Sequence, residues 1–251
     1  MRHAVAILAI RPSIIWMDLL SSFTEYDLYI VCDCNKEDYG AMWTATYPKI
    51  RFIQMPASEA SDAGFSNLST AVSPKQVVNA WDKAVYYFSK KQNYEHLWLI
   101  EEDVFFHHEK TLRDIDLHYK DDDLLSAPIT SKNQDRASSW FWHWPAFAIN
   151  LPEPHYRGMV CAIRVSRGLL RFIRQYAEKN KTLFFLEALF PTVARHYGLI
   201  CNEPPELSTI TYIREWQIEE IGRVNLYHPM KNLIEHKDAR AIERFFFGLD
   251  P

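Results

Sequence analysis

Glycine is scarce in this chain, which has only seven glycines in 251 residues. The sequence contains no G-x-G-x-x-G pattern and no P-loop pattern. These are the loops that bring a backbone close to a dinucleotide or a triphosphate. The sequence therefore argues against Rossmann-type dinucleotide binding and against a Walker-type phosphate cradle.

Cysteine is rarer still, with four residues at positions 32, 34, 161 and 201. They are too few and too irregularly spaced for a disulfide framework or a zinc ribbon. Cys32 and Cys34 stand in an apolar run, where a strand would direct both side chains to one face. We interpret the cysteines as small core residues of a protein from a reducing compartment.

The chain also lacks a long hydrophobic run and an excess of basic residues. The opening "MRHAVAILAI" reaches Arg11-Pro12 after eight mostly apolar residues. That is too short for a signal peptide or a membrane span. With a net charge of -4 and a pI near 6.2, there is no global basic footprint for nucleic acid. We expect a cytoplasmic protein with no membrane anchor and no nucleic-acid partner.

What the chain does have is a large apolar fraction, 48% hydrophobic and 14% aromatic, enough for a sizeable core. Apolar runs predict strands and helical spacing predicts helices, and the two kinds alternate along the first half of the chain. This order is typical of an open, mostly parallel α/β sheet, whose ligands bind at the carboxyl ends of the strands. We predict strands at 3–10, 27–34, 49–55, 97–106, 123–127 and 159–165, helices at 13–23, 74–91, 112–119, 167–180 and 182–197, a long loop at 57–73, and no regular pattern in the tail from 204 to 251.

The most informative stretch is "LWLIEEDVFF" at 97–106, where an apolar strand runs into Glu101, Glu102 and Asp103. Three adjacent carboxylates repel one another unless a cation or several hydrogen-bond donors neutralise them. A hard cation such as Mn²⁺ or Mg²⁺ does this with oxygen ligands and leaves positions open for phosphates. The alternative is a solvated strand end with ordinary acidic residues.

The segment "LIEEDVF" resembles the metal motif of GT-A glycosyltransferases, in the E-D-D variant of inverting N-acetylglucosaminyltransferases. Two further segments, "LFFLEALF" (183–190) and "PPELSTI" (204–210), follow in the order found in that family, so the resemblance covers roughly residues 3–212. It implies that Asp103 binds the metal and that Glu101 and Glu102 face the nucleotide sugar. The middle position departs from the family pattern by being Glu.

Glu187 is the candidate general base. An inverting transfer needs one carboxylate to take the proton of the acceptor hydroxyl. Glu187 stands in an otherwise apolar stretch, where desolvation would raise its pKa toward a useful value. The alternative is a glutamate on the solvent face of its helix.

A second motif, "NLYHPMK" at 225–231, is similar to the C-terminal segment with which several GT-A enzymes complete the site. The resemblance implies that His228 binds the metal and that Lys231 contacts the diphosphate. A histidine before proline is otherwise a common turn residue.

Donor contacts are expected from the first two strand ends, which neighbour the metal strand. Ile10 and Arg11 would pass the nucleotide, and Asp33 would accept a hydrogen bond from the uracil or the ribose, as the resemblance supports. A simple turn cap is the alternative for Asp33. Lys83, with Asp82 beside it, lies on the helix that leads into the metal strand and is a further donor candidate.

Tryptophans crowd the segment "SSWFWHWPAF" at 138–147. Alternation places Trp140, Trp142 and Trp144 on one face of an extended segment, where their rings would form a platform for the acceptor sugar. Core packing is the usual alternative for such residues.

Together these features predict a single GT-A-like α/β domain, with residues 1–106 as the nucleotide-sugar-binding half and 107–251 as the acceptor-binding half. The predicted function is a metal-dependent, inverting transfer from a UDP-sugar to a glycan or glycoprotein. Overall resemblance to xylosyltransferase-type enzymes of large algal viruses implies UDP-xylose and the cytoplasm of an infected host. Two alternatives stay open: another metal-dependent phosphate enzyme such as a nucleotidyltransferase, and a non-catalytic glycan-binding module.

Overall fold

The computed structural model describes residues 3–69, 77–91, 93–135, 142, 149–212 and 214–247. Its strands are β1 (His3–Ala9), β2 (Tyr26–Cys32), β3 (Ile50–Ile53), β4 (His96–Glu101), β5 (Leu124–Leu125), β6 (Ile129–Ser131), β7 (Tyr156–Gly158), β8 (Ala162–Ser166) and β9 (Cys201–Asn202). Its α-helices are α1 (Ile14–Ser21), α2 (Tyr39–Trp43), α3 (Ala57–Asp62), α4 (Ala80–Ser89), α5 (Glu109–His118), α6 (Arg167–Asn180), α7 (Leu186–His196) and α8 (Leu233–Phe247). Short 3₁₀ turns occupy Pro205–Leu207 and Ile218–Glu220.

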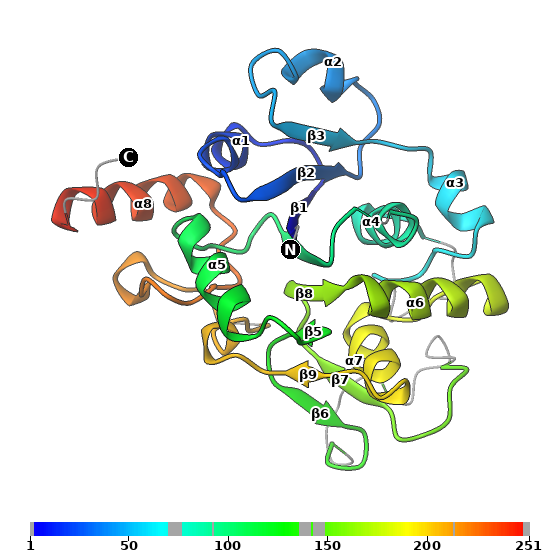
Figure 1. Cartoon of the computed structure of the whole chain (residues 1–251). Coiled ribbons are helices and arrows are strands. Elements are labelled where there is room, and N and C mark those ends of the chain that lie inside the picture. The colour runs from blue at the N-terminus through cyan, green and yellow to red at the C-terminus, as the bar shows by residue number, and fades with distance from the viewer. Residues whose placement is uncertain are drawn as a thin grey trace.

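One seven-stranded sheet in the order β3-β2-β1-β4-β8-β5-β9 forms the centre of the molecule (Figure 1). The first four of these strands are parallel, whereas β8 is antiparallel to both β4 and β5. Strands β6 and β7 pair separately. The predicted open, mostly parallel α/β sheet is confirmed.

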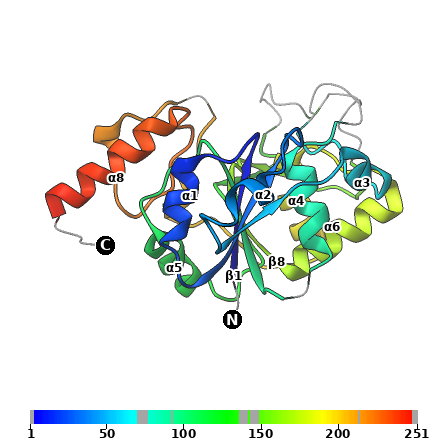
Figure 2. The ribbon, with the colours of Figure 1, turned by 90° about the horizontal axis from the view of Figure 1, so that it is seen from above.

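Strand β1 is buried on both faces, because its residues alternate between two cores. Ala4 and Ala6 belong to the core under α4, α6 and α7, and Val5 and Ile7 belong to the core under α1 and α5. A continuous apolar run is what such a doubly covered strand requires. Helices therefore flank the sheet on both sides, as Figure 2 shows from above.

Short helices are where the sequence prediction was wrong. The expected long loop at 57–73 begins with α3, and α2 follows β2 without a periodic signal.

Helix α4 begins at Ala80 instead of residue 74. Its start is fixed by Asn79, whose side chain accepts from the Trp81 N–H at 3.0 Å, while the Asp82 carboxylate accepts from the Asn79 N–H at 3.0 Å. This reciprocal pair is a capping box, which satisfies two backbone donors at the helix end.

Helix α8 lies in the tail where no helix was predicted. The His236 ring hydrogen-bonds to the Met230 carbonyl at 2.8 Å, and the Arg240 guanidinium donates to the Phe106 carbonyl at 3.0 Å. These contacts attach α8 to the tail segment that precedes it and to the segment that follows the acidic cluster. Within the described ranges, the structure has no helix with the length and apolar character of a membrane span.

Candidate functional site

Four chain segments meet at one edge of the sheet, at the carboxyl ends of the parallel strands. The Glu102 N–H donates to the Leu8 carbonyl at 3.1 Å, and the Asp33 N–H donates to the Ala9 carbonyl at 2.9 Å. Strand β8 runs the opposite way, so the residue before it, Cys161, lies at the same edge, with its carbonyl 2.8 Å from the Glu101 nitrogen. The chain order reverses between β1 and β4, which is the usual place for a ligand in such a sheet.

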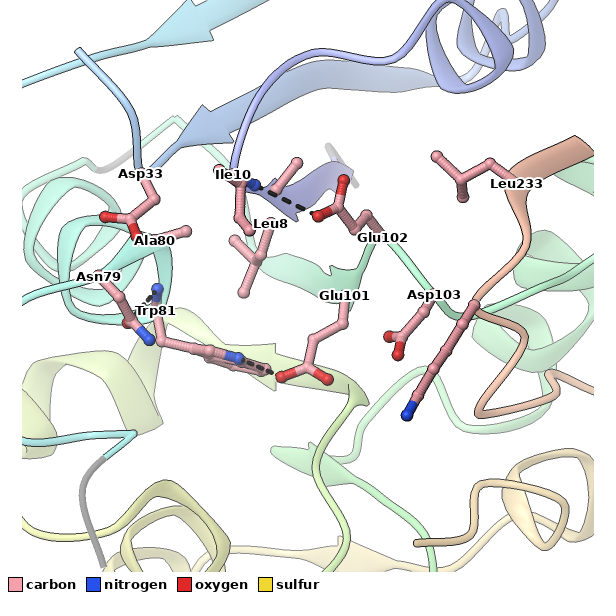
Figure 3. Close-up of a pocket in the computed structure, with 12 residues that line it drawn as sticks. Leu8, Ile10, Asp33, Asn79, Ala80, Trp81, Glu101, Glu102, Asp103 and Leu233 are labelled. Atoms are coloured by element: carbon pink, nitrogen blue, oxygen red, sulfur yellow. Dashed lines mark hydrogen bonds between the residues drawn. The ribbon is translucent and has the colours of Figure 1, made fainter. Parts of the chain in front are cut away.

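A cavity of about 450 Å³ opens at this edge (Figure 3). Its size falls in the range of small-molecule sites. Strand ends, the start of α4 and the tail segment all contribute to it. The lining residues are Leu8, Ala9, Ile10, Asp33, Asn79, Ala80, Trp81, Glu101, Glu102, Asp103, Lys231 and Leu233.

The three carboxylates of the acidic cluster have different surroundings. Glu101 accepts a hydrogen bond from the Trp81 indole N–H at 2.6 Å. Glu102 is turned toward β1, where its carboxylate accepts from the Ile10 N–H at 3.4 Å (Figure 3). Asp103 lies 3.5 Å from the Nε2 atom of His228.

His228 is buried and its ring is held in one orientation. The Nδ1 atom lies 2.6 Å from the Thr211 carbonyl, which can only accept, so Nδ1 carries the hydrogen. The Nε2 atom then faces the Glu101 and Asp103 carboxylates, at 3.8 and 3.5 Å. The Met230 N–H also donates to the Asp103 carbonyl at 2.7 Å, which ties the tail segment to the strand end.

Burial and mutual charge shift the pKa values of these groups in different directions. Burial raises the pKa of Glu101, and the charge of Asp103 adds to the effect. Burial also raises the pKa of Glu102. At the third acid, burial is outweighed by the hydrogen bond and charge of His228, so the pKa of Asp103 is lowered. Burial lowers the pKa of His228, but the hydrogen bond and charge of Asp103 outweigh it, so the pKa of His228 is raised.

These residues fit a divalent cation. Glu101 and Asp103 supply carboxylate oxygens from one strand end, and His228 presents a nitrogen whose ring is fixed through the opposite atom. A histidine that donates its other N–H to a carbonyl is the usual arrangement at metal sites. Oxygen ligands with one imidazole suit Mn²⁺ or Mg²⁺.

A second cavity of about 320 Å³ adjoins the first and shares Asn79, Trp81, Glu101 and Lys231 with it. Helix α7 contributes Glu187 from its first turn, half-buried among apolar side chains. The remaining lining residues are Ser69, Met159, Cys161, Phe185, Leu186, Tyr212, His228 and Pro229. The structure thus places Glu187 in the same cavity as Glu101 of the acidic cluster.

Other predicted residues lie around these cavities. Lys83 is buried behind the first cavity and does not line it. Its ammonium donates to the Cys32 and Asp33 carbonyls at 3.2 and 2.6 Å, and the Asp33 carboxylate lies 3.7 Å away. Lys83 therefore fixes the end of β2 instead of facing the cavity.

Arg11 is exposed beside the first cavity and interacts with Cys34.

Of the predicted tryptophan platform, only Trp142 is described; Trp140 and Trp144 lie outside the described residues. The Trp142 side chain packs on the edge of a core cluster, and its indole N–H donates to the Asp135 carboxylate at 3.0 Å. The same carboxylate also pairs with Arg157 at 2.6 Å.

Sequence reasoning missed Trp81, Asn79, Thr211 and Cys161. Trp81 stands in a stretch with the apolar spacing of a helix, and nothing in the sequence shows that its N–H reaches Glu101. Cys161 was treated as a core residue, because its position opposite Glu101 depends on β8 being antiparallel. An apolar run does not reveal strand direction, so no sequence signal would have found it.

Comparisons with known proteins agree on the fold. No family model and no curated protein matches the sequence. A structure of the galactosyltransferase LgtC in complex with donor and acceptor sugar analogues aligns with a TM-score of 0.50 at 9% identity, over 96% of this chain and 95% of LgtC. An active-site mutant of LgtC gives the same values. Apo mouse xyloside xylosyltransferase 1 aligns at 0.46 and 12% identity, over 92% of this chain and 98% of the mouse chain.

At such low identity the likeness shows the fold alone, and the LgtC alignment is the one that carries it. The chain therefore has the open α/β sheet that its element order predicted, in the GT-A-like form that its motif resemblance implied.

Proposed function

We propose that this chain is a metal-dependent glycosyltransferase that moves a sugar from a UDP-sugar to a glycan acceptor. The observation that carries the proposal is the pair of adjoining cavities, which meet at Glu101 and Lys231 beside the His228 ring. A transferase that joins two substrates needs two such compartments with one shared wall. The fold likeness to LgtC, a galactosyltransferase whose structure holds donor and acceptor sugar analogues, supports this proposal.

The 450 Å³ cavity is the donor compartment in this proposal. Asp33 and Ile10, at the ends of β2 and β1, would bind the nucleoside, and Arg11 flanks the entrance. Lys231 supplies a positive charge next to Asp103, whose pKa it helps to lower. That charge would stabilise the diphosphate as negative charge grows on it during departure.

Glu101, Asp103 and His228 would hold the Mn²⁺ or Mg²⁺ ion. When bound, such an ion neutralises the diphosphate as a Lewis acid. Trp81 and the Thr211 carbonyl then orient two of the ligands from behind, which is the role of outer hydrogen bonds at metal sites.

The 320 Å³ cavity is the acceptor compartment. Glu187 would take the proton of the acceptor hydroxyl while that oxygen bonds to the anomeric carbon and the bond to UDP breaks. The proton is then on Glu187, the sugar is bonded to the acceptor oxygen and UDP leaves. This single displacement inverts the anomeric configuration. The apolar residues Met159, Phe185 and Tyr212 would contact the carbon face of the acceptor sugar. The tryptophan segment at 138–147 stays a predicted extension of this platform.

The test is a transfer assay with Mn²⁺, glycan acceptors and a panel of UDP-sugars that includes UDP-xylose, the donor implied by sequence resemblance. We expect release of UDP that requires the metal, and a product of inverted configuration by NMR. A chain that binds glycans without any nucleotide would be a binding module. Release of pyrophosphate from a nucleoside triphosphate would identify a nucleotidyltransferase instead.

A further inference from the structure

Two ligand sets share the Glu101 and His228 side chains. With Asp103 they form the set at the edge of the 450 Å³ cavity, which Glu101 and Asp103 line and which His228 and Cys161 do not. With Cys161 they line the 320 Å³ cavity, which Asp103 does not line. The ligand atoms of Glu101, Cys161 and His228 all lie within 4.8 Å of one another.

We propose that Glu101, Cys161 and His228 form a second cation site, specific for a thiophilic divalent ion of the Zn²⁺ class. One sulfur, one nitrogen and one oxygen ligand make a donor set that zinc accepts and that Mg²⁺ and Mn²⁺ do not prefer. Three protein ligands leave a fourth position open toward the cavity.

The geometry requires only small side-chain movements. Zinc binds these atoms at roughly 2.0–2.3 Å, so ligand atoms in a tetrahedral site stand about 3.5 Å apart. The Thr211 carbonyl, 2.6 Å from Nδ1, already directs the Nε2 atom of His228 toward the other ligands. Burial and the neighbouring Glu101 carboxylate both raise the pKa of the Cys161 thiol. A bound cation would replace the thiol proton, which passes to solvent.

Both sites cannot be filled together, because the same carboxylate and the same imidazole complete each of them. Zinc should therefore displace Mn²⁺ from Glu101 and His228, and bound zinc should not support the reaction that Mn²⁺ supports. One consequence rests on the proposed function: zinc would occupy the acceptor compartment beside Glu187 and block the acceptor, not the donor.

Cobalt binding tests the site without any substrate. Co²⁺ takes zinc's place in such sites, and a thiolate ligand gives it a charge-transfer band in the near ultraviolet. All cobalt titrations use the Cys34→Ser variant as the parent chain, because the Cys34 thiol is more accessible than the Cys161 thiol. We expect the band with one Co²⁺ per chain, its loss in Cys161→Ser, its retention in the matched control Cys201→Ser, and its removal by added Zn²⁺.

Serine is close to cysteine in size and shape, so Cys161→Ser should fold; a melting temperature within a few degrees of the control confirms this. His228→Ala should weaken the band as well. Absence of the band in the parent chain, or its persistence in folded Cys161→Ser, would overturn the proposal. The cobalt test contains no nucleotide or sugar, so it is independent of the transfer assay. A failed cobalt test would not contradict the proposed transferase activity, and a failed transfer assay would not contradict the cobalt result.

Discussion

The three adjacent carboxylates at the end of β4 point in different directions. Glu101 and Asp103 face the His228 ring, whereas Glu102 is turned to the Ile10 backbone. The sequence predicts a metal site at the triplet but does not indicate which of its side chains face His228. Which side chain points where depends on the turn after the strand, and that turn is fixed by His228 and Met230 far along the chain.

Glu187→Gln tests the general base at this scale. The amide preserves the shape of the side chain and removes its basicity, so we expect kcat to fall by about 10²–10⁴-fold. Affinity for the UDP-sugar should barely change, because Glu187 lines the 320 Å³ cavity and not the 450 Å³ cavity proposed for the donor. Steady-state kinetics with varied donor and acceptor separates the two effects.

The matched control is Glu203→Gln, an exposed glutamate after β9 that should leave kcat unchanged. A Glu187→Gln enzyme with near-normal kcat, or with its defect mainly in donor binding, would remove Glu187 from the role of base.

Among the elements, the short ones around β3 depend on single residues more than on periodicity. Helix α3 ends at Asp62, and Gly64, two residues later, has a φ of +87°. A Cβ atom there would lie 2.4 Å from the Ala177 carbonyl oxygen of α6. Hydrophobic spacing carries no such information, which is why this region was predicted as a loop.

Gly64→Ala should therefore destabilise the fold through both backbone strain and a clash. We expect a loss of about 2–4 kcal/mol in the free energy of unfolding. Gly198→Ala is the matched control: its φ is +66°, but a Cβ there meets nothing within 4 Å, so about 1 kcal/mol of strain is expected. Urea denaturation of both variants measures the difference; equal losses would mean that the α3–α6 approach is not tight.

The docking of α8 should make stability depend on pH. Burial lowers the pKa of His236 from 6.5 to about 4. Its Nδ1 atom has no hydrogen-bond partner among the described residues, so the charged ring would bury an unpaired donor. Since the folded pKa is the lower one, the unfolded chain binds more protons between these values, and the contribution of His236 to stability is lost as pH falls from 6.5 toward 4.

His236→Gln can keep the hydrogen bond to Met230 and cannot titrate. Between about pH 7 and pH 5, the wild-type chain should lose roughly 2 kcal/mol more unfolding free energy than this variant. Denaturation curves at several pH values measure the two slopes. Parallel slopes would show that the ring is not buried in its neutral form.

For the whole molecule, the alternation of apolar runs and helical stripes was enough to predict the sheet and the edge at which ligands collect. The reversal of β8 and the fold of the tail were not predictable, because both depend on contacts between distant segments. Those two features bring Cys161 and His228 to Glu101. The donor identity, the inverting course, the cytoplasmic location and the viral resemblance stay predictions from sequence.

The central claim is that the first cavity binds a nucleoside diphosphate through a metal held by this chain's own residues. Isothermal titration of UDP into the wild-type chain, with and without Mn²⁺, and into Asp103→Asn with Mn²⁺ tests it most directly. The control is Asp114→Asn on α5, whose half-buried carboxylate forms an ion pair with Lys110. We expect UDP binding that requires Mn²⁺, falls by about 10–100-fold or more in Asp103→Asn, and is unchanged in the control. UDP affinity that is equal with and without Mn²⁺, or equal in Asp103→Asn and the wild type, would contradict the account.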